Sequence, residues 1–105
     1  MRLMDLLRGN NIDSGVEQYR NTSGAVLLDV RERDEYAEGR IPGSVNMPLS
    51  QLESRAASLD KAAPIYVYCL SGGRSSRAAA ILTAKGFANV KNIGGISGWK
   101  GELEK

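Results

Sequence analysis

The sequence contains no histidine and one cysteine, Cys69, among its 105 residues. The lack of histidine excludes Ser-His and Cys-His catalytic dyads and every histidine-based metal site. The single cysteine excludes an internal disulfide, a CxxC pair and a resolving thiol within the chain. Any thiol chemistry must therefore be carried out by Cys69 without a histidine base, and we expect no cofactor.

Excess charge and long apolar runs are also scarce. The chain has 14 basic and 12 acidic residues, a balance too mild to favour a nucleic-acid partner. No apolar run reaches the roughly 18–20 residues that span a bilayer. Asp5 interrupts the leucines near the start, so we expect neither a membrane segment nor a signal peptide. The expectation is a cytoplasmic monomer with one domain over residues 1–105.

Predicted strands alternate with predicted helices along the chain. Apolar runs predict strands buried on both faces at 25–30 and 65–69, and shorter strands at 44–47 and 89–93. Helices are expected at 14–20, 33–38, 50–59 and 75–85. Capping-box patterns open the first and third helices at Ser14 and Ser50, and Ser97 is expected to cap a last helix that holds Trp99. This alternation predicts an α/β fold with an open, mostly parallel sheet and helices on both faces.

Cys69 ends one predicted strand and is followed by the segment Leu70-Ser71-Gly72-Gly73-Arg74-Ser75. Ligands of open α/β sheets bind beyond the carboxyl ends of the strands. The two glycines allow the loop to form an anion-binding nest of N–H groups, while the following helix N-terminus and Arg74 add positive charge. Such surroundings lower the pKa of a cysteine from about 8.5 to about 3.5–7.5. A lone cysteine is more often a buried apolar residue, but this loop favours a nucleophile and would also hold an anionic persulfide.

The segment 69–75 resembles the C-x-S-G-x-R-S active-site loop of the rhodanese family of single-domain thiosulfate sulfurtransferases. Gly94-Gly95 with Trp99 resembles the family's G-G-x-x-x-W motif. Upstream, the family's first signature is matched by Asp29-Val30-Arg31, Glu35-Tyr36 and Gly39-Arg40-Ile41-Pro42-Gly43-Ser44 through Asn46 and Pro48. The match runs in the right order from about residue 12 to residue 105.

The resemblance implies a three-layer rhodanese-like fold with a central, mostly parallel sheet of about five strands. It implies that Cys69 takes sulfane sulfur from thiosulfate, which is a small anion, or from a persulfide donor. The sulfur would pass to a thiophilic acceptor: cyanide, a thiol or a sulfur-accepting protein. Backbone amides of Leu70 through Arg74 would cradle the sulfur, with the Ser71 and Ser75 hydroxyls pointing into the loop.

Two residues depart from the family pattern. Arg40 stands where the family often has histidine, and would add positive potential. Leu70 stands where many thiosulfate-using members carry a basic residue, which favours a less charged or protein-bound donor. Asp29 and Arg31 could orient the cysteine loop, but the favoured interpretation is a structural ion-pair network that also includes Glu35.

Two other functional classes stay open. Cysteine-based phosphatases and arsenate reductases use a similar nest with a C-x5-R loop, whereas Cys69 and Arg74 are spaced as C-x4-R. The tighter ring suits one sulfur atom better than a phosphate. The other class is a non-enzymatic rhodanese-like sulfur carrier or binding module that docks to one partner protein, for which the apolar Leu70 provides the support.

Overall fold

The computed structural model describes residues 11–105. Within this range the sheet has four strands, all parallel, in the order β2-β1-β3-β4. They are β1 (Val26–Asp29), β2 (Val45–Asn46), β3 (Ile65–Cys69) and β4 (Val90–Gly95). The expected parallel sheet is confirmed with four strands in residues 11–105 rather than about five.

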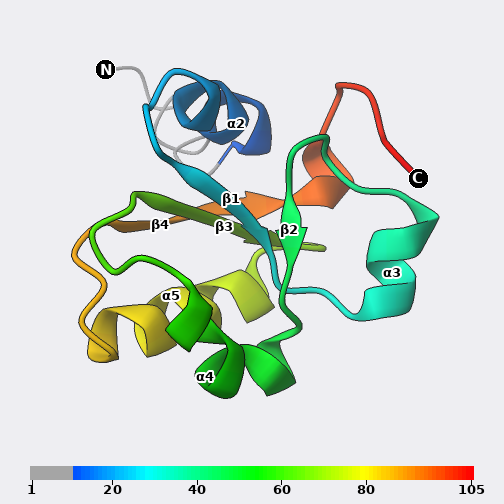
Figure 1. The fold of residues 1–105 in the computed structure, drawn as a ribbon. Helices are drawn as coiled ribbons and strands as arrows, with labels where there is room; N and C mark the ends of the chain where they lie inside the picture. The colour runs from blue at the N-terminus through cyan, green and yellow to red at the C-terminus, as the bar shows by residue number, and fades with distance from the viewer. Residues whose placement is uncertain (1–10) are drawn as a thin grey trace.

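Helices cover both faces of the sheet, which confirms the three-layer architecture (Figure 1). Helix α2 (Ile12–Arg20) lies on one face, and α4 (Leu52–Arg55) and α5 (Gly73–Ala84) lie on the other. Helix α3 (Arg33–Glu38) follows the carboxyl end of β1. Three 3-10 turns complete the order: η1 (Leu49–Gln51), η2 (Ala56–Ser58) and η3 (Ile96–Gly98). None of the helices in residues 11–105 has the length and apolar character needed to cross a membrane.

The core has two halves because strand side chains alternate between the two faces. Along β3, Ile65, Val67 and Cys69 pack on the side of α4 and α5. Tyr66 and Tyr68 pack on the opposite side, against the cluster that contains residues of α2. Burial of both faces explains why β1 and β3 read as continuous apolar runs in the sequence. The Cys69 side chain therefore lies in the core at the point where its strand ends.

The first predicted helix begins earlier than its capping-box pattern indicates. Asn11 is the N-cap, and its Oδ1 accepts a hydrogen bond from the Asp13 N–H at 2.8 Å. Ser14 instead donates through Oγ to the Asn11 carbonyl at 3.2 Å. The predicted Ser14 cap is wrong because the helix begins at Ile12, and the Asn11 side chain accepts from the Asp13 N–H in its first turn.

Two other predicted helices are also corrected. The region 50–59 forms one α-helical turn, α4, between η1 and η2, and no side chain caps any of the three. The expected last helix at Ser97 is the 3-10 turn η3, and Trp99 lies just beyond it. Trp99 is nevertheless a packing residue of the core half that faces α2. By contrast, α3 spans the predicted residues 33–38 and ends at Gly39.

Candidate active site

The thiol of Cys69 lies at the carboxyl end of the central strand β3. Cys69 is 1% exposed and pairs across the sheet with Gly95 of β4. On the other side, the preceding residue Tyr68 pairs with Asp29 of β1. The cysteine thus stands where parallel strands end together, the usual position of a ligand site in such sheets.

The cysteine loop, residues 69–75, wraps the sulfur, and its last three residues begin α5. Gly72 has a φ of +111°, a conformation that residues with a Cβ rarely adopt. This conformation lets its N–H donate to Cys69 Sγ at 3.0 Å. Helix α5 starts at the next residue, Gly73, earlier than the predicted Ser75. The positive N-terminal end of α5 therefore lies beside the sulfur.

The backbone of β4 packs closely against the backbone of the cysteine loop. A Cβ on Gly95 would lie 2.1 Å from the Leu70 carbonyl oxygen and 2.5 Å from the Ser71 Cα. The Ser97 N–H donates to the same Leu70 oxygen at 3.0 Å. This close backbone approach explains why the sequence needs glycine at position 95.

Ser75 brings a buried hydroxyl to the sulfur, whereas Ser71 is exposed. Ser75 Oγ lies 3.4 Å from Cys69 Sγ. Burial is the largest influence on the pKa of Cys69 and raises it, but the hydrogen bonds from Ser75 and from the Gly72 and Ser71 backbones together outweigh it. The net effect is a lowered pKa, so the loop itself favours the thiolate without a histidine.

Asn92 is a residue of this site that the sequence analysis missed. Its Oδ1 accepts from Ser75 Oγ at 2.7 Å and from the Gly94 N–H at 3.0 Å. Its Nδ2 donates to the Gly72 carbonyl at 3.4 Å. Asn92 pairs with Val67, whose side chain faces α4 and α5, and the regular pairing is interrupted only after Asn92, where Tyr68 pairs with Gly94. Strand alternation in the predicted segment 89–93 was the available signal, because it places Asn92 on the same face as Val90.

Arg74 is paired with Glu35 of α3 rather than left as a free cation at the loop. Its Nη1 donates to Glu35 Oε1 at 2.7 Å, and its Nη2 donates to Glu35 Oε2 at 3.1 Å. The hydrogen bond from Arg74 is the main reason that the pKa of Glu35 falls to about 2. Glu35 is coupled to the Asp29–Arg31 pair by Coulomb attraction to Arg31, but the hydrogen bonds of its carboxylate go to Arg74.

Asp29 and Arg31 form a separate buried ion pair, as the structural interpretation predicts. Arg31 Nη2 lies 2.7 Å from Asp29 Oδ2 and also donates to the Gly39 carbonyl at 2.8 Å. Burial lowers the pKa of Arg31, but its hydrogen bond and Coulomb attraction to Asp29 raise it overall. Asn46 Nδ2 donates to the Asp29 and Arg31 carbonyls at 3.0 Å each. The Arg31 side chain thus ties the end of β1 to the segment after α3, and Asn46 ties it to β2.

Arg40 contacts Glu104 in the C-terminal segment. Its Nε lies 3.5 Å from Glu104 Oε1, and its guanidinium lies 4.7 Å from the ring centroid of Tyr36. Its backbone forms an isolated antiparallel bridge with Glu104. The charge of Arg40 is therefore engaged with these two residues.

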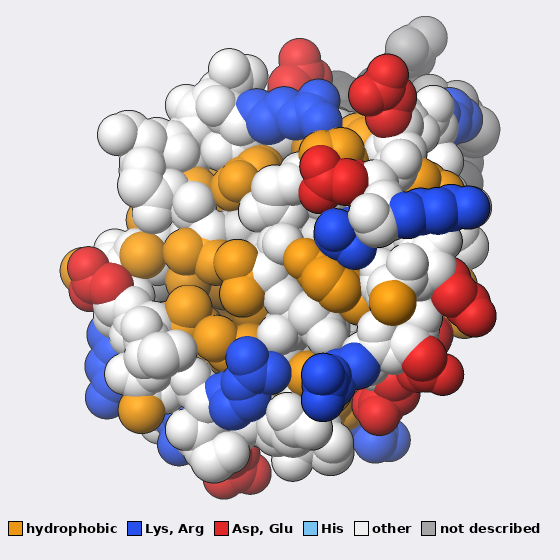
Figure 2. Space-filling model, turned by 45° about the vertical axis from the view of Figure 1, so that its right-hand side comes forward, with side chains coloured by type: hydrophobic (Ala, Val, Ile, Leu, Met, Phe, Trp, Pro, Cys, Tyr) orange, Lys and Arg blue, Asp and Glu red, His pale blue; other side chains and the backbone are white. Residues whose placement is uncertain are grey.

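An apolar pocket of about 290 Å³ opens beside the cysteine loop and is lined by Arg31, Glu35, Glu38, Gly39, Leu70, Ile96 and Leu103. Leu70 is 46% exposed and Leu103 is 55% exposed. Within residues 11–105 they are two of the three large hydrophobic residues with high exposure. We call the pocket lined by these seven residues the Leu70 pocket. On the face shown in Figure 2, apolar side chains lie at the surface among charged ones.

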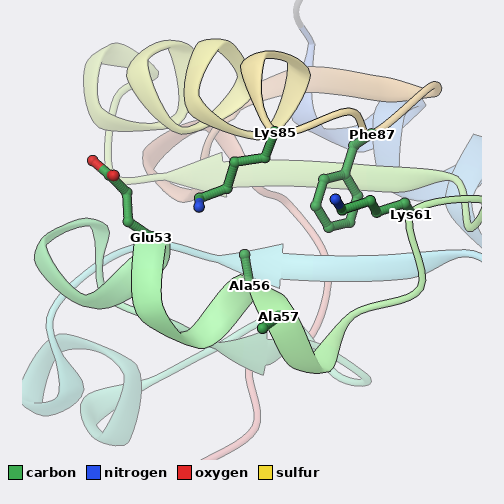
Figure 3. A pocket seen from close by; sticks show the side chains of 6 residues that line it. All are labelled: Glu53, Ala56, Ala57, Lys61, Lys85 and Phe87. Atoms are coloured by element: carbon green, nitrogen blue, oxygen red, sulfur yellow. The ribbon is translucent and has the colours of Figure 1, made fainter.

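A second pocket of about 460 Å³ lies away from Cys69. It is lined by Glu53, Ala56, Ala57, Lys61, Lys85 and Phe87, between α4 and the end of α5 (Figure 3). No residue of the cysteine loop lines it. In residues 11–105 no three acidic, cysteine or histidine side chains cluster as a metal site.

Comparison with known families gives a match to the rhodanese-like domain over residues 14–102. Among curated proteins, the protein YrkF of Bacillus subtilis is 43% identical over 79 residues, which cover 74% of this chain and 43% of that protein. This chain therefore spans less than half the length of YrkF. A protein named sulfurtransferase from Allochromatium vinosum is 36% identical over 93 residues, covering 86% of this chain and 87% of that protein.

Solved structures of rhodanese domains are also similar to this chain. A structure described as a rhodanese with anions from E. coli superposes with a TM-score of 0.70 and 31% sequence identity. The match covers 77% of this chain and 98% of that chain.

Proposed function

The chain belongs to the family of rhodanese-like domains, and we propose on this premise that it transfers sulfane sulfur through a persulfide on Cys69. One observation carries the proposal: Cys69 Sγ lies within a loop whose Gly72 N–H donates to it at 3.0 Å, beside the N-terminus of α5. This arrangement favours an anionic sulfur. Both a thiolate nucleophile and a persulfide fit that description.

In the first half-reaction, the Cys69 thiolate attacks the outer sulfur of the donor. A new bond forms between Sγ and this sulfur while the donor's own bond to it breaks. The leaving group departs with the electron pair, as sulfite if the donor is thiosulfate or as a thiolate if the donor is a persulfide. The loop N–H groups and the positive end of α5 stabilise the negative charge on the transferred sulfur.

In the second half-reaction, a thiophilic acceptor attacks the outer sulfur of the persulfide. The bond between that sulfur and Sγ breaks, and its electron pair restores the Cys69 thiolate. Cyanide gives thiocyanate, and a thiol gives a new persulfide. No group on the protein changes its oxidation state over the full cycle.

The charges around the loop support a weakly charged or protein-bound donor over free thiosulfate. Thiosulfate is a dianion, and the guanidinium of Arg74 is already neutralised by Glu35 at 2.7 Å. The residue after the cysteine is the apolar Leu70. The loop therefore offers backbone dipoles but little net positive charge to a dianion.

The Leu70 pocket supports a protein as one of the two sulfur partners. Leu70, Ile96 and Leu103 offer apolar contact area next to the nucleophile, which a small anion cannot use. A partner with apolar residues around its reactive cysteine would bury this area and gain affinity. Cytoplasmic location and a monomeric state stay predictions from the sequence.

Intact mass measurement tests the proposal directly. The protein is incubated with thiosulfate or with a low-molecular-weight persulfide, beside the Cys69→Ala variant. We expect a gain of about 32 Da, one sulfur atom, that cyanide removes and that the variant lacks. The persulfide should load the protein at lower concentration than thiosulfate does.

Other outcomes assign the protein elsewhere. No mass gain with either donor, together with hydrolysis of an aryl phosphate, would contradict sulfur transfer and indicate a cysteine phosphatase. No reaction of either kind would indicate a binding module.

A further inference from the structure

The Ser75 hydroxyl has a single hydrogen and more than one acceptor around it. Asn92 Oδ1 lies at 2.7 Å, the Gly72 carbonyl at 3.1 Å, and Cys69 Sγ and the Gly94 carbonyl at 3.4 Å each. A hydroxyl donates one hydrogen bond at a time and accepts through its lone pairs. The shortest contact therefore identifies Asn92 as the acceptor in this structure.

The backbone fixes the orientation of the Asn92 amide. The Gly94 N–H can only donate, and it lies 3.0 Å from Oδ1. The Gly72 carbonyl can only accept, and it lies 3.4 Å from Nδ2. The amide oxygen must therefore face Ser75, where it accepts from the hydroxyl. With its hydrogen on Asn92, Ser75 Oγ presents a lone pair to the sulfur, which suits a protonated S–H.

We propose that Asn92 and the Cys69 thiolate compete for the hydroxyl hydrogen of Ser75. Asn92 holds this hydrogen while Sγ carries its own proton or is bonded to a second sulfur. When Sγ becomes a thiolate, the hydroxyl turns from Asn92 to the sulfur. Asn92 is thus a positioning residue that acts on Cys69 through Ser75, and its place in the catalytic cycle rests on the proposed function.

This competition sets how reactive the thiolate is. A hydrogen bond from Ser75 lowers the pKa of Cys69, but a more stabilised thiolate is also a weaker nucleophile. By holding the hydrogen at 2.7 Å, Asn92 prevents Ser75 from stabilising the thiolate fully. The sulfur therefore keeps a higher pKa than full donation from Ser75 would give it, and a higher intrinsic reactivity.

Four charged side chains at this end of the sheet form two ion pairs. Arg74 of α5 is bound to Glu35 of α3, and Arg31 is bound to Asp29 at the end of β1. A substitution at Asn92 changes none of these pairs directly. A shift in the reactivity of Cys69 can therefore be traced to the Ser75 hydroxyl.

The test measures the rate of Cys69 alkylation by iodoacetamide against pH, which requires no sulfur donor. The variants are Asn92→Leu, Ser75→Ala and the double variant, with Asn89→Leu as a control because Asn89 is exposed on the same segment. We expect Asn92→Leu to lower the pKa of Cys69 by about half a unit to one unit and to reduce the rate plateau at high pH. Ser75→Ala should raise the pKa, and the double variant should match Ser75→Ala alone.

Several results would overturn the proposal. A pKa that rises or stays unchanged in folded Asn92→Leu would show that Asn92 does not compete with the sulfur. A lowering that persists in the Ser75→Ala background would show that it does not act through Ser75. If Asn92→Leu does not fold, Asn92→Ala is measured against the same outcomes. Because sulfur loading is measured separately by mass, failure of sulfur transfer and failure of this competition give different results.

Discussion

Arg74 and Glu35 are joined by two parallel hydrogen bonds, of 2.7 Å and 3.1 Å, across 39 positions of the sequence. The pair ties the first turn of α5, which carries the cysteine loop, to α3. Bidentate arginine–carboxylate contacts are among the stronger hydrogen-bonded pairs in proteins. In this chain the pair both holds the loop and cancels its side-chain cation.

Replacing Glu35 by glutamine should reduce stability in a pH-dependent way. The pKa of Glu35 in the folded protein is about 2, below the ordinary value of about 4.3. Its stabilising effect is therefore complete above about pH 4.3 and is lost as the pH falls toward the folded value. We expect Glu35→Gln to cost about 1 kcal/mol at pH 6, allowing for partial exposure, and less at pH 3. Urea unfolding at both pH values checks this, with Glu38→Gln as the control from the same helix; an unchanged cost at pH 3 would contradict it.

Placing arginine at position 70 should improve the use of thiosulfate. Leu70→Arg adds an exposed positive charge next to Cys69, and attraction to a dianion over a few ångströms should lower the KM for thiosulfate about five-fold. The value of kcat should change little, because the charge acts mainly on binding. Steady-state thiocyanate formation measures both constants. Leu103→Arg, in the same pocket but not next to the cysteine, should have a smaller effect, and an equal effect would refute the local explanation.

Gly95→Ala should disrupt the cysteine loop. The new Cβ would lie 2.1 Å from the Leu70 carbonyl oxygen, so backbone must move, and we expect a loss near the upper end of about 1–3 kcal/mol. Sulfur loading should fall with stability because the loop no longer surrounds Sγ. Gly98→Ala is the control, since its Cβ would make an ordinary 3.7 Å contact with Ile12. Thermal unfolding and intact mass give the two readouts, and similar behaviour of the two variants would argue against this steric role.

The buried ion pair of Asp29 with Arg31 should contribute much more to stability than the ion pair of Arg40 with Glu104. Asp29→Ala leaves the buried guanidinium of Arg31 without its carboxylate, so we expect a cost of about 3–5 kcal/mol. Arg40→Ala removes a more exposed pair with Glu104 and should cost no more than about 1 kcal/mol. Urea denaturation compares the free energies of unfolding. Equal costs would show that Asp29 and Arg31 do not brace the end of β1.

The sequence alone determined the features that depend on neighbouring residues. The apolar run 65–69 predicted β3 with its observed bounds, and the segment 33–38 with Gly39 predicted α3. The strand–loop–helix order placed Cys69 at the carboxyl end of a buried strand. Periodicity and glycine positions are local properties, and burial of a parallel sheet imposes them directly on the sequence. Together with the motif order, they were enough to indicate the fold and the cysteine loop.

Helix ends and the last helix were predicted less well, because the competing choices are close in energy. Both asparagine and serine are good N-cap residues, and Asn11 is the N-cap of α2. At Ser97 the chain forms a single 3-10 turn, where the Ser97 N–H donates to the Leu70 carbonyl of the cysteine loop.

Only the tertiary structure decided which side chains share the site. The choice of Arg74 as the partner of Glu35 depends on how α3 and α5 meet at the sheet edge. The approach of Asn92 to Ser75 depends on the register between β3 and β4, and a shift of one residue in strand register turns a side chain to the opposite face. These contacts join segments far apart in the chain, and their geometry is fixed by packing that no local sequence pattern records. The sequence thus determined where Cys69 lies, while the tertiary structure decided what surrounds it.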